Sequence, residues 1–277
     1  MEYLHDLRIS SKVVVKVGTS TLCYPNGRLN FQRIDALAAV LSLLQKSGRK
    51  LILVSSGAIA AGSGRLGLAG KPAELAEKQA LAAIGQAGLM KIYQKMFGVR
   101  QQQVAQVLVT KDIVEVAERR QNASNTLLAL LDMDIIPIIN ENVTLATDEI
   151  EIGDNDTLSG YIAALVDADL LVMLSDIEGL YSADPRQDPA AKLLSLVTEI
   201  TSELETMARG AGSQFGTGGM VTKLLAAKIC RDAGRIPVVI AQGKNPAVLT
   251  DILAGKKVGT VFWWKGNGEQ GTGNGER

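Results

Sequence analysis

Residues 12–58 read KVVVKVGTSTLCYPNGRLNFQRIDALAAVLSLLQKSGRKLILVSSGA and contain two short apolar runs separated by a longer segment. The runs, 12–17 and 50–55, are rich in valine, isoleucine and leucine, as buried strands are. Between them, residues 31–46 place apolar side chains at the period of a helix. A strand, a helix and a second strand in this order predict two parallel strands joined by a helix.

The same alternation continues to the end of the chain. Further strands are predicted at 104–109, 135–139, 170–174, 236–241 and 258–262. Helices are predicted at 72–97, 117–133, 156–166, 202–207 and 219–232. This pattern predicts an α/β fold with a mainly parallel sheet covered by helices on both faces. We expect residues 1–264 to form a single domain and the Gly-rich residues 265–277 to form a disordered tail.

Composition narrows the class of function. Lys plus Arg equals Asp plus Glu at 29 each, so net charge does not indicate binding to nucleic acid or to an acidic membrane. Two distant cysteines, Cys23 and Cys230, and one histidine, His5, fit neither a disulfide framework nor an ordinary zinc site. The N-terminus is charged where a signal peptide is apolar, and no apolar run reaches the ~18 residues of a membrane span. We expect a cytoplasmic protein with a small-molecule ligand.

Small and polar residues follow several of the predicted strands. Lys16 precedes GTS, and the next strands are followed by SSGA at 55–58, NEN at 140–142, SD at 175–176 and AQGKNP at 241–246. In open α/β sheets, ligands bind beyond the carboxyl ends of the strands. The sequence therefore predicts a site for a polar ligand at this edge.

The segment FGTGGMVTKLLAAK at 215–228 has two interpretations. By itself it is more typical of a surface turn before a helix, because it lacks the G-x-x-x-x-G-K-[ST] order of a P-loop. Its glycines and Lys223 at a helix start would also suit a phosphate group. If Lys16 and Lys223 converge on one edge, they could stabilise a phosphoryl group from two sides.

The segment EIGDNDTLSG at 151–160 supplies negative charge. Asp154 and Asp156 flank Asn155, and Asp154 would serve as a helix N-cap, which is the commoner role. A cap needs one such residue, whereas two are present. The carboxylates could instead hold Mg2+ or orient a lysine in a phosphoryl-transfer site.

Gly62, Gly64 and Gly67 spell G-x-G-x-x-G, the dinucleotide-binding pattern. That pattern must directly follow a strand and be followed by an acidic residue about 20 positions on. Here the strand ends near Ser55, and the apolar LAAIG occupies the later position. We exclude a nicotinamide site.

Taken together, the motifs VVKVGTS, VSSGAIAAG, NEN, GDNDTLS, SDIEGLYSADPR and GTGGMVTK resemble those of the amino-acid kinase family over residues 12–262. The resemblance implies an open three-layer αβα sandwich. It implies transfer of the γ-phosphoryl group of ATP to the side-chain carboxylate of L-glutamate, the first step of proline biosynthesis. It also implies Mg2+ as a cofactor, and it places the substrate mainly on the N-terminal half of the domain and ATP on the C-terminal half.

The resemblance also implies residue roles. Lys16 and Lys223 would stabilise the transferring phosphoryl group, Asp156 would organise the lysines, and Asp154 with Asp156 would bind Mg2+. Contacts to glutamate are implied for Ser56, Gly57, Asn140, Val143 and Asn155. Contacts to ATP are implied for Lys16, Ser175, Asp176, Thr217, Gly218, Gly219, Met220, Val221, Thr222 and Lys223.

Two departures from the family pattern bear on function. Members usually read N-E-N-D, with the aspartate near the substrate ammonium group, but this chain has Val143, and Asp148 or Glu149 would have to substitute. An alternative is therefore a sibling kinase acting on an N-acylated or otherwise modified acidic amino acid. A catalytically silent nucleotide or amino-acid sensor is a second alternative. The second departure is that the chain has no residues for the C-terminal PUA domain of many relatives. The family resemblance also implies a homo-oligomer and inhibition by proline.

Overall fold

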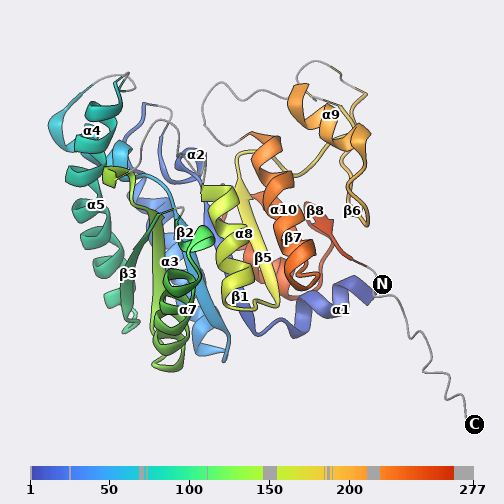
Figure 1. Cartoon of the computed structure of the whole chain (residues 1–277), viewed down its shortest axis with the longest axis horizontal. Coiled ribbons are helices and arrows are strands. Elements are labelled where there is room, and N and C mark those ends of the chain that lie inside the picture. The colour runs from blue at the N-terminus through green and yellow to red at the C-terminus, as the bar shows by residue number, and fades with distance from the viewer. Residues whose placement is uncertain are drawn as a thin grey trace, which may run out of the picture.

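The sheet of the computed structural model has eight strands in the order β3-β4-β2-β1-β5-β7-β8-β6 (Figure 1). The structure describes residues 2–24, 26–68, 72, 74–110, 112–145, 155–183, 185, 188, 190–210 and 219–264. The strands are β1 Lys12–Val17, β2 Lys50–Ser55, β3 Val104–Val109, β4 Ile136–Glu141, β5 Leu170–Ser175, β6 Leu196–Val197, β7 Val238–Gln242 and β8 Thr260–Phe262. Strands β7 and β8 pair antiparallel, and the other described pairs are parallel. The predicted mainly parallel sheet is confirmed.

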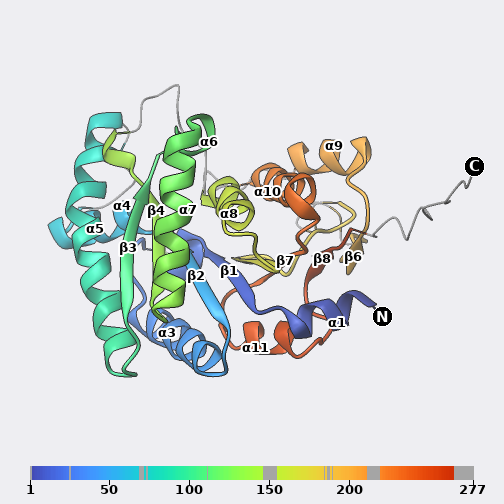
Figure 2. The ribbon, with the colours of Figure 1, turned by 60° about the horizontal axis from the view of Figure 1, so that its bottom comes forward.

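Helices cover both faces of this sheet, as the two ribbon views show (Figures 1 and 2). One layer contains α1 Glu2–Ile9, α3 Phe31–Lys46, α5 Leu75–Gly98 and α11 Val248–Leu253. The other contains α7 Ala117–Asp132, α8 Asn155–Leu165 and α10 Met220–Gly234. The shorter elements are α2 Thr19–Leu22, α4 Ala58–Leu66, α6 Asp112–Glu115, the 3-10 helix η1 Val143–Leu145 and α9 Ser202–Gly210. The three-layer αβα architecture is therefore confirmed.

Strand β1 lies in the middle of the sheet and shows why the core divides into two clusters. Successive strand residues point to opposite faces. Val13 and Val15 accordingly belong to the cluster below α3 and α5, whereas Val14 belongs to the cluster below α8 and α10. Lys16 shares the parity of Val14, so it projects toward α8 and α10. Its position is fixed by pairing with Val54 of β2 and Met173 of β5.

Helix α4 is a correction to the sequence-based prediction, which placed no helix at residues 58–66. Its sequence AIAAGSGRL contains two glycines, and glycine lowers helix propensity. Packing against α5 stabilises the helix instead. A Cβ atom at Gly62 would lie 2.1 Å from the Leu81 carbonyl oxygen, and one at Gly85 would lie 1.7 Å from that of Ala58. Gly62, one of the three glycines of the dinucleotide-like pattern, thus lets α4 pack in direct contact with α5.

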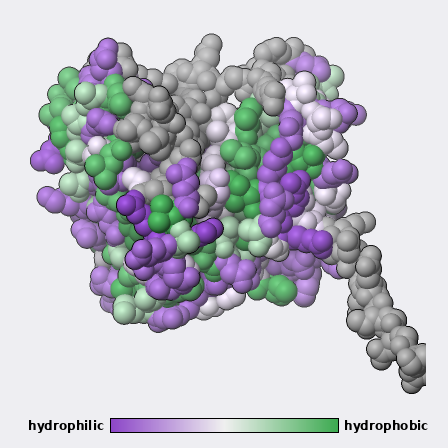
Figure 3. Space-filling view, viewed as in Figure 1, coloured by the Kyte–Doolittle hydropathy of each residue, from purple (hydrophilic) through white to green (hydrophobic). Residues whose placement is uncertain are grey.

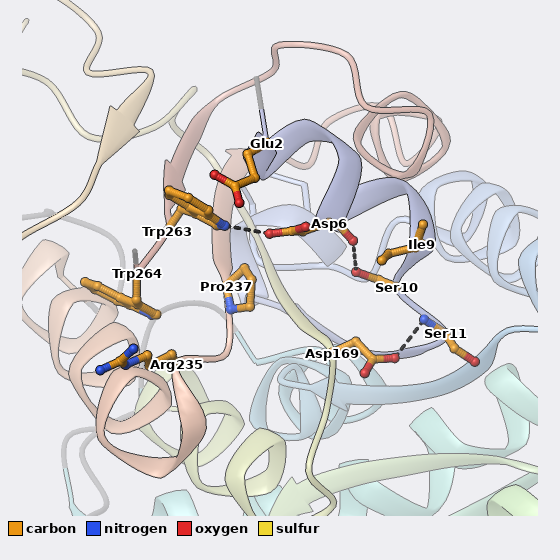
Figure 4. A pocket seen from close by; sticks show the side chains of 10 residues that line it. All are labelled: Glu2, Asp6, Ile9, Ser10, Ser11, Asp169, Arg235, Pro237, Trp263 and Trp264. Atoms are coloured by element: carbon orange, nitrogen blue, oxygen red, sulfur yellow. Dashed lines mark hydrogen bonds between the residues drawn. The ribbon is translucent and has the colours of Figure 1, made fainter. Parts of the chain in front are cut away.

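A hollow of about 600 Å3 lies at the amino ends of β1, β5 and β7 (Figure 4). Its lining includes Trp263, whose Nε1 donates to Asp6 over 2.7 Å, and Asp169, which accepts the backbone N–H groups of Ser11 and Lys12. The first bond attaches the residue after β8 to α1, and the other two join the start of β5 to the start of β1. The hollow is at the edge opposite the polar strand ends, and its tryptophan contacts are structural.

The outer face of α7, α8 and α10 mixes hydrophilic and hydrophobic residues (Figure 3). Among the residues that the structure describes, no helix is both long enough and apolar enough to cross a membrane. The predicted tail, 265–277, lies outside the described residues.

Candidate functional site

Asp156 lies between the two lysines that the sequence analysis singled out. Its Oδ1 is 2.6 Å from Lys16 Nζ, and its Oδ2 is 2.8 Å from Lys223 Nζ. All three side chains are buried, with exposed fractions of 0% for Asp156, 6% for Lys16 and 7% for Lys223. The structure therefore brings together groups that are separated by more than two hundred positions in the chain.

Local structure explains how each of the three groups reaches this point. Lys16 stands near the carboxyl end of β1, and its ammonium group lies next to Gly18, where a Cβ atom would be 3.4 Å from Nζ. Asp156 and Lys223 lie in the first turns of α8 and α10. The amino end of a helix favours a carboxylate.

Helices α8 and α10 approach each other closely through small residues. A Cβ atom at Gly160 would lie only 3.0 Å from both the Cα and the carbonyl oxygen of Ala226. Gly160 is one turn beyond Asp156, and Ala226 is almost one turn beyond Lys223. The glycine thereby brings the two helix starts within the reach of one ion pair.

The protonation state of Asp156 follows from two opposing effects. Burial by itself raises the pKa of this carboxyl group, but the neighbouring ammonium groups of Lys16 and Lys223 outweigh burial and hold the pKa well below its ordinary value. The carboxylate is therefore ionised at neutral pH. In that state it holds two ammonium groups in fixed positions at the edge of the sheet.

A second cluster joins four uncharged side chains beside this ion triad. Asn155 Nδ2 donates to Ser56 Oγ over 2.8 Å and to Asn140 Oδ1 over 2.9 Å. Asn140 Nδ2 in turn donates to Gln86 Oε1 of α5 over 2.9 Å. The structure thus brings together three residues that the sequence analysis assigned to the substrate, and it adds Gln86. Its only signal in the sequence is a glutamine among the apolar and small residues of 81–88, LAAIGQAG.

The turn after β2 is held from α5 as well. The Ser55 and Tyr93 hydroxyl groups lie 2.7 Å apart, and burial raises the pKa of Tyr93, so this phenol stays protonated. Gly57 then adopts a φ of 105° at the start of α4, a conformation that suits glycine. These contacts fix where Ser56 and Gly57 lie.

Val143 begins η1, directly after β4, and is half-buried. The preceding residue, Asn142, donates its backbone N–H to the Val109 carbonyl oxygen over 2.7 Å, which fixes the start of the turn. Asp148 and Glu149, the residues named as substitutes for a carboxylate at position 143, lie outside the described residues.

The residues assigned to the nucleotide lie at the starts of α10 and of the loop after β5. Among the described residues, no side chain caps the amino end of α10 at Gly219, and none of their atoms lies within 4 Å of the position that a Cβ atom would take there. The first N–H groups of a helix without such a cap suit an anion. The Thr222 hydroxyl lies 2.9 Å from the Gly219 carbonyl oxygen and 3.1 Å from Asp156 Oδ2. Ser175 donates to Asp176 over 3.2 Å.

The remaining assigned nucleotide residues have different surroundings. Met220 is buried and Val221 is 46% exposed. Thr217 and Gly218 lie outside the described residues, as does the candidate metal ligand Asp154. For the other candidate metal ligand, Asp156, each carboxylate oxygen already lies on a lysine. The described part of the chain contains no group of three His, Cys, Asp or Glu side chains that could hold a metal.

Neither cysteine belongs to this site. Burial raises the pKa of Cys23 to about 11, an effect that Arg33 partly offsets, and burial raises the pKa of Cys230 to about 12. Both thiols are free and buried. A thiolate nucleophile is therefore disfavoured at both positions.

Comparison with known proteins extends the resemblance to most of the chain. Residues 11–242 match the model of the amino acid kinase family. The chain is 50% identical over 261 residues to the glutamate 5-kinase of Listeria innocua, covering 93% of this chain and 94% of the relative. It is 51% identical to the glutamate 5-kinase of Clostridium tetani, covering 94% of this chain and 96% of the relative.

Solved structures show the same fold at low sequence identity. UMP kinase from Ureaplasma parvum superposes with a TM-score of 0.62 at 14% identity, covering 92% of this chain and 99% of that one. Isopentenyl phosphate kinase from T. acidophilum gives 0.61 at 17% identity, covering 91% of this chain and 99% of that one. Because the family model covers most of the chain and these relatives share about half of its residues, we conclude that the chain belongs to the amino acid kinase family.

Proposed function

We propose that the protein is an ATP-dependent kinase that phosphorylates the side-chain carboxylate of L-glutamate to give L-glutamyl 5-phosphate, the first step of proline biosynthesis. Two kinds of support converge on this proposal. Relatives named glutamate 5-kinase share about half of their residues with this chain. The single structural observation that carries it is the Lys16–Asp156–Lys223 triad at the carboxyl edge of the sheet.

The chemistry that such a site must perform fits the triad. A side-chain carboxylate with a pKa of ~4.3 is ionised at neutral pH, so it needs no general base to act as a nucleophile. The oxygen attacks the γ-phosphorus, and the bond from that phosphorus to the bridging oxygen of ADP breaks. Repulsion between two anions is the main obstacle. Lys16 and Lys223 offset it by placing positive charge where negative charge redistributes in the transition state.

The two halves of the site take different parts of the reaction. Ser56, Asn140 and Asn155 form the substrate side and hold the amino acid next to the triad. The amino end of α10 and the residues Ser175 and Asp176 form the nucleotide side. Because Lys16 stands on the central strand between these sides, it can reach a phosphoryl group in transfer from one to the other.

We propose that Mg2+ is bound by the phosphate oxygens of ATP, where it would neutralise part of their charge. Of the two candidate metal ligands, Asp156 lies among the described residues, and both of its carboxylate oxygens already contact lysines. The role of Asp156 in this proposal is to orient Lys16 and Lys223.

The proposed function is tested with a panel of acidic substrates and ATP. Glutamate should cause ADP release, and hydroxylamine should trap the acyl phosphate as a hydroxamate. Turnover with an N-acylated acidic amino acid, but none with glutamate, would instead identify a sibling kinase, the alternative that Val143 favours. Nucleotide binding without phosphoryl transfer to any substrate in the panel would identify a sensor and overturn the proposal.

Restoring a carboxylate at position 143 tests how the substrate ammonium group is recognised. We expect Val143→Asp to lower the KM for glutamate by roughly tenfold, because a charge pair with the ammonium group would form in a partly desolvated site. The measurement is steady-state kinetics with glutamate varied at saturating ATP. Leu145→Asp, at a residue 70% exposed in the same short helix, is the matched control for a general effect of charge. A higher KM in Val143→Asp would indicate a pocket built around an apolar contact.

Further properties are proposed from the family resemblance. We propose a cytoplasmic homo-oligomer whose activity is inhibited by proline. Free, buried thiols are compatible with a reducing compartment. Light scattering would measure the mass of the assembly, and addition of proline to the glutamate assay would measure inhibition. Residues 1–264 are proposed to form one catalytic domain.

A further inference from the structure

The amide side chains of the substrate side form a chain of hydrogen bonds with one direction. Asn155 Nδ2 donates to Asn140 Oδ1, and Asn140 Nδ2 donates to Gln86 Oε1, each over 2.9 Å. Asn155 Nδ2 also donates to Ser56 Oγ over 2.8 Å. The bonds run from the start of α8 through the end of β4 to the middle of α5. Gln86 is the final acceptor of this chain.

We propose that Gln86 is a positioning residue that determines which atoms of Asn155 and Ser56 face the amino-acid substrate. This inference rests on the proposed function, because it concerns recognition of glutamate. An amide has an acceptor on one side and donors on the other. Once Gln86 presents its oxygen to Asn140, the orientation of Asn140 is fixed, and the orientation of Asn155 follows from it.

The consequence is a defined polarity at the substrate side. Both hydrogens of Asn155 Nδ2 are used, so Asn155 presents its Oδ1 as an acceptor. That oxygen is buried and has no hydrogen-bond partner among the described residues. The whole residue is 8% exposed. Ser56 accepts a hydrogen bond from Asn155, so its own hydroxyl hydrogen is directed elsewhere and can be donated. One acceptor and one donor thus lie side by side.

An α-amino acid requires this pair of groups. Its ammonium group donates hydrogen bonds, and its α-carboxylate accepts them. Asn155 Oδ1 suits the ammonium group, and the Ser56 hydroxyl suits the α-carboxylate. Because Val143 provides no acceptor, a correctly oriented Asn155 oxygen matters more in this chain. If the amide of Asn140 were rotated by half a turn, Asn155 would present a donor to the substrate and Ser56 an acceptor.

Helix α5 holds Gln86 in a fixed place. Gly85 allows α5 to lie directly against α4, since a Cβ atom there would be 1.7 Å from the Ala58 carbonyl oxygen. Two turns further along, on the same side of the helix, the Tyr93 hydroxyl lies 2.7 Å from Ser55 Oγ. The helix is therefore fixed on both sides of position 86, and its glutamine can set the orientation of residues on other elements.

The experiment compares two variants. Gln86→Met removes the acceptor and keeps a similar side-chain size. Gln86→Glu keeps an acceptor, and its ionised carboxylate presents an oxygen in either orientation. We expect Gln86→Met to raise the KM for glutamate on the order of tenfold, because a buried amide loses its partner and its orientation. The KM for ATP should stay within about threefold of the wild type, and Gln86→Glu should restore the lower KM for glutamate. Gln94→Met, at an exposed glutamine of the same helix, is the matched control.

Glutarate distinguishes positioning from a general loss of packing, because it has both carboxylates of glutamate and no ammonium group. In Gln86→Met, the inhibition constant of glutarate should rise less than the KM for glutamate. Equal increases for both compounds, or an increase in the KM for ATP of the same size, would overturn the inference. So would an unchanged KM for glutamate in Gln86→Met while the wild type remains active. Absence of glutamate turnover in the wild type would overturn the proposed function and this inference together.

Discussion

Alanine in place of Lys223 or of Lys16 is expected to lower kcat by about 10²-fold or more. Each ammonium group would stabilise the negative charge that develops on the phosphoryl group in the transition state. Removal of one preorganised electrostatic contact of this kind typically lowers kcat by about 10²-fold or more. The KM for glutamate should change less, because the uncharged substrate-side residues remain. The measurement is steady-state kinetics of glutamate-dependent ADP release for both variants.

Lys228→Ala is the control for this pair of variants. Lys228 lies on α10, as Lys223 does, but it forms an ion pair with Glu205 near the surface. Its loss should leave kcat within about twofold of the wild type, since surface ion pairs contribute little. Unchanged turnover in both Lys16→Ala and Lys223→Ala would remove these residues from the chemistry.

Asp156→Asn is expected to have the largest effect on stability. The substitution keeps the size of the side chain but removes the buried carboxylate that contacts Lys16 and Lys223. Breaking a buried ion pair by removing one partner costs about 3–5 kcal/mol of unfolding free energy. We also expect kcat to fall by about 10²-fold, because the lysines lose the group that orients them. Urea denaturation at pH 7, read alongside turnover, would measure both effects.

The pH dependence of the same variant has a definite sign. Because the pKa of Asp156 is lower in the folded protein than its ordinary value of 3.8, this carboxylate stabilises the fold above that value. The stabilisation is lost as the pH falls below 3.8 toward the folded pKa. The difference in unfolding free energy between the wild type and Asp156→Asn should therefore be constant from pH 7 to about pH 5 and shrink at lower pH. A difference that already shrinks between pH 7 and pH 6 would contradict this assignment.

Much of the fold and of the ion triad could be predicted from the sequence because both depend on strong local patterns. Apolar runs such as 12–17 and 50–55 identify the buried strands, and parallel strands bring their carboxyl ends to one edge. Lys16 stands near one such end, and Asp156 and Lys223 follow glycines at predicted helix starts. Topology made it possible for the two lysines to converge, and the family resemblance implied that Asp156 would lie between them.

The features that escaped prediction depend on contacts between distant segments. Helix α4 has two glycines, which lower helix propensity, and it forms because Gly62 and Gly85 allow close packing with α5. Gln86 looked like one polar residue in a long helix, because nothing local shows that its oxygen reaches Asn140 at the end of β4. Residues 146–154 and 211–218, which hold Asp154, Thr217 and Gly218, lie outside the described part of the chain, so their assigned roles stay predictions.

The contact between Gly160 and Ala226 affects how homologous sequences are interpreted. A larger residue at position 160 would push α8 away from α10 and separate the carboxylate from the ammonium group without altering either one. During evolution, activity could thus be lost by drift at a position that carries no functional group. Homologues that retain every charged residue of the triad should therefore be inspected at this glycine before they are counted as working enzymes.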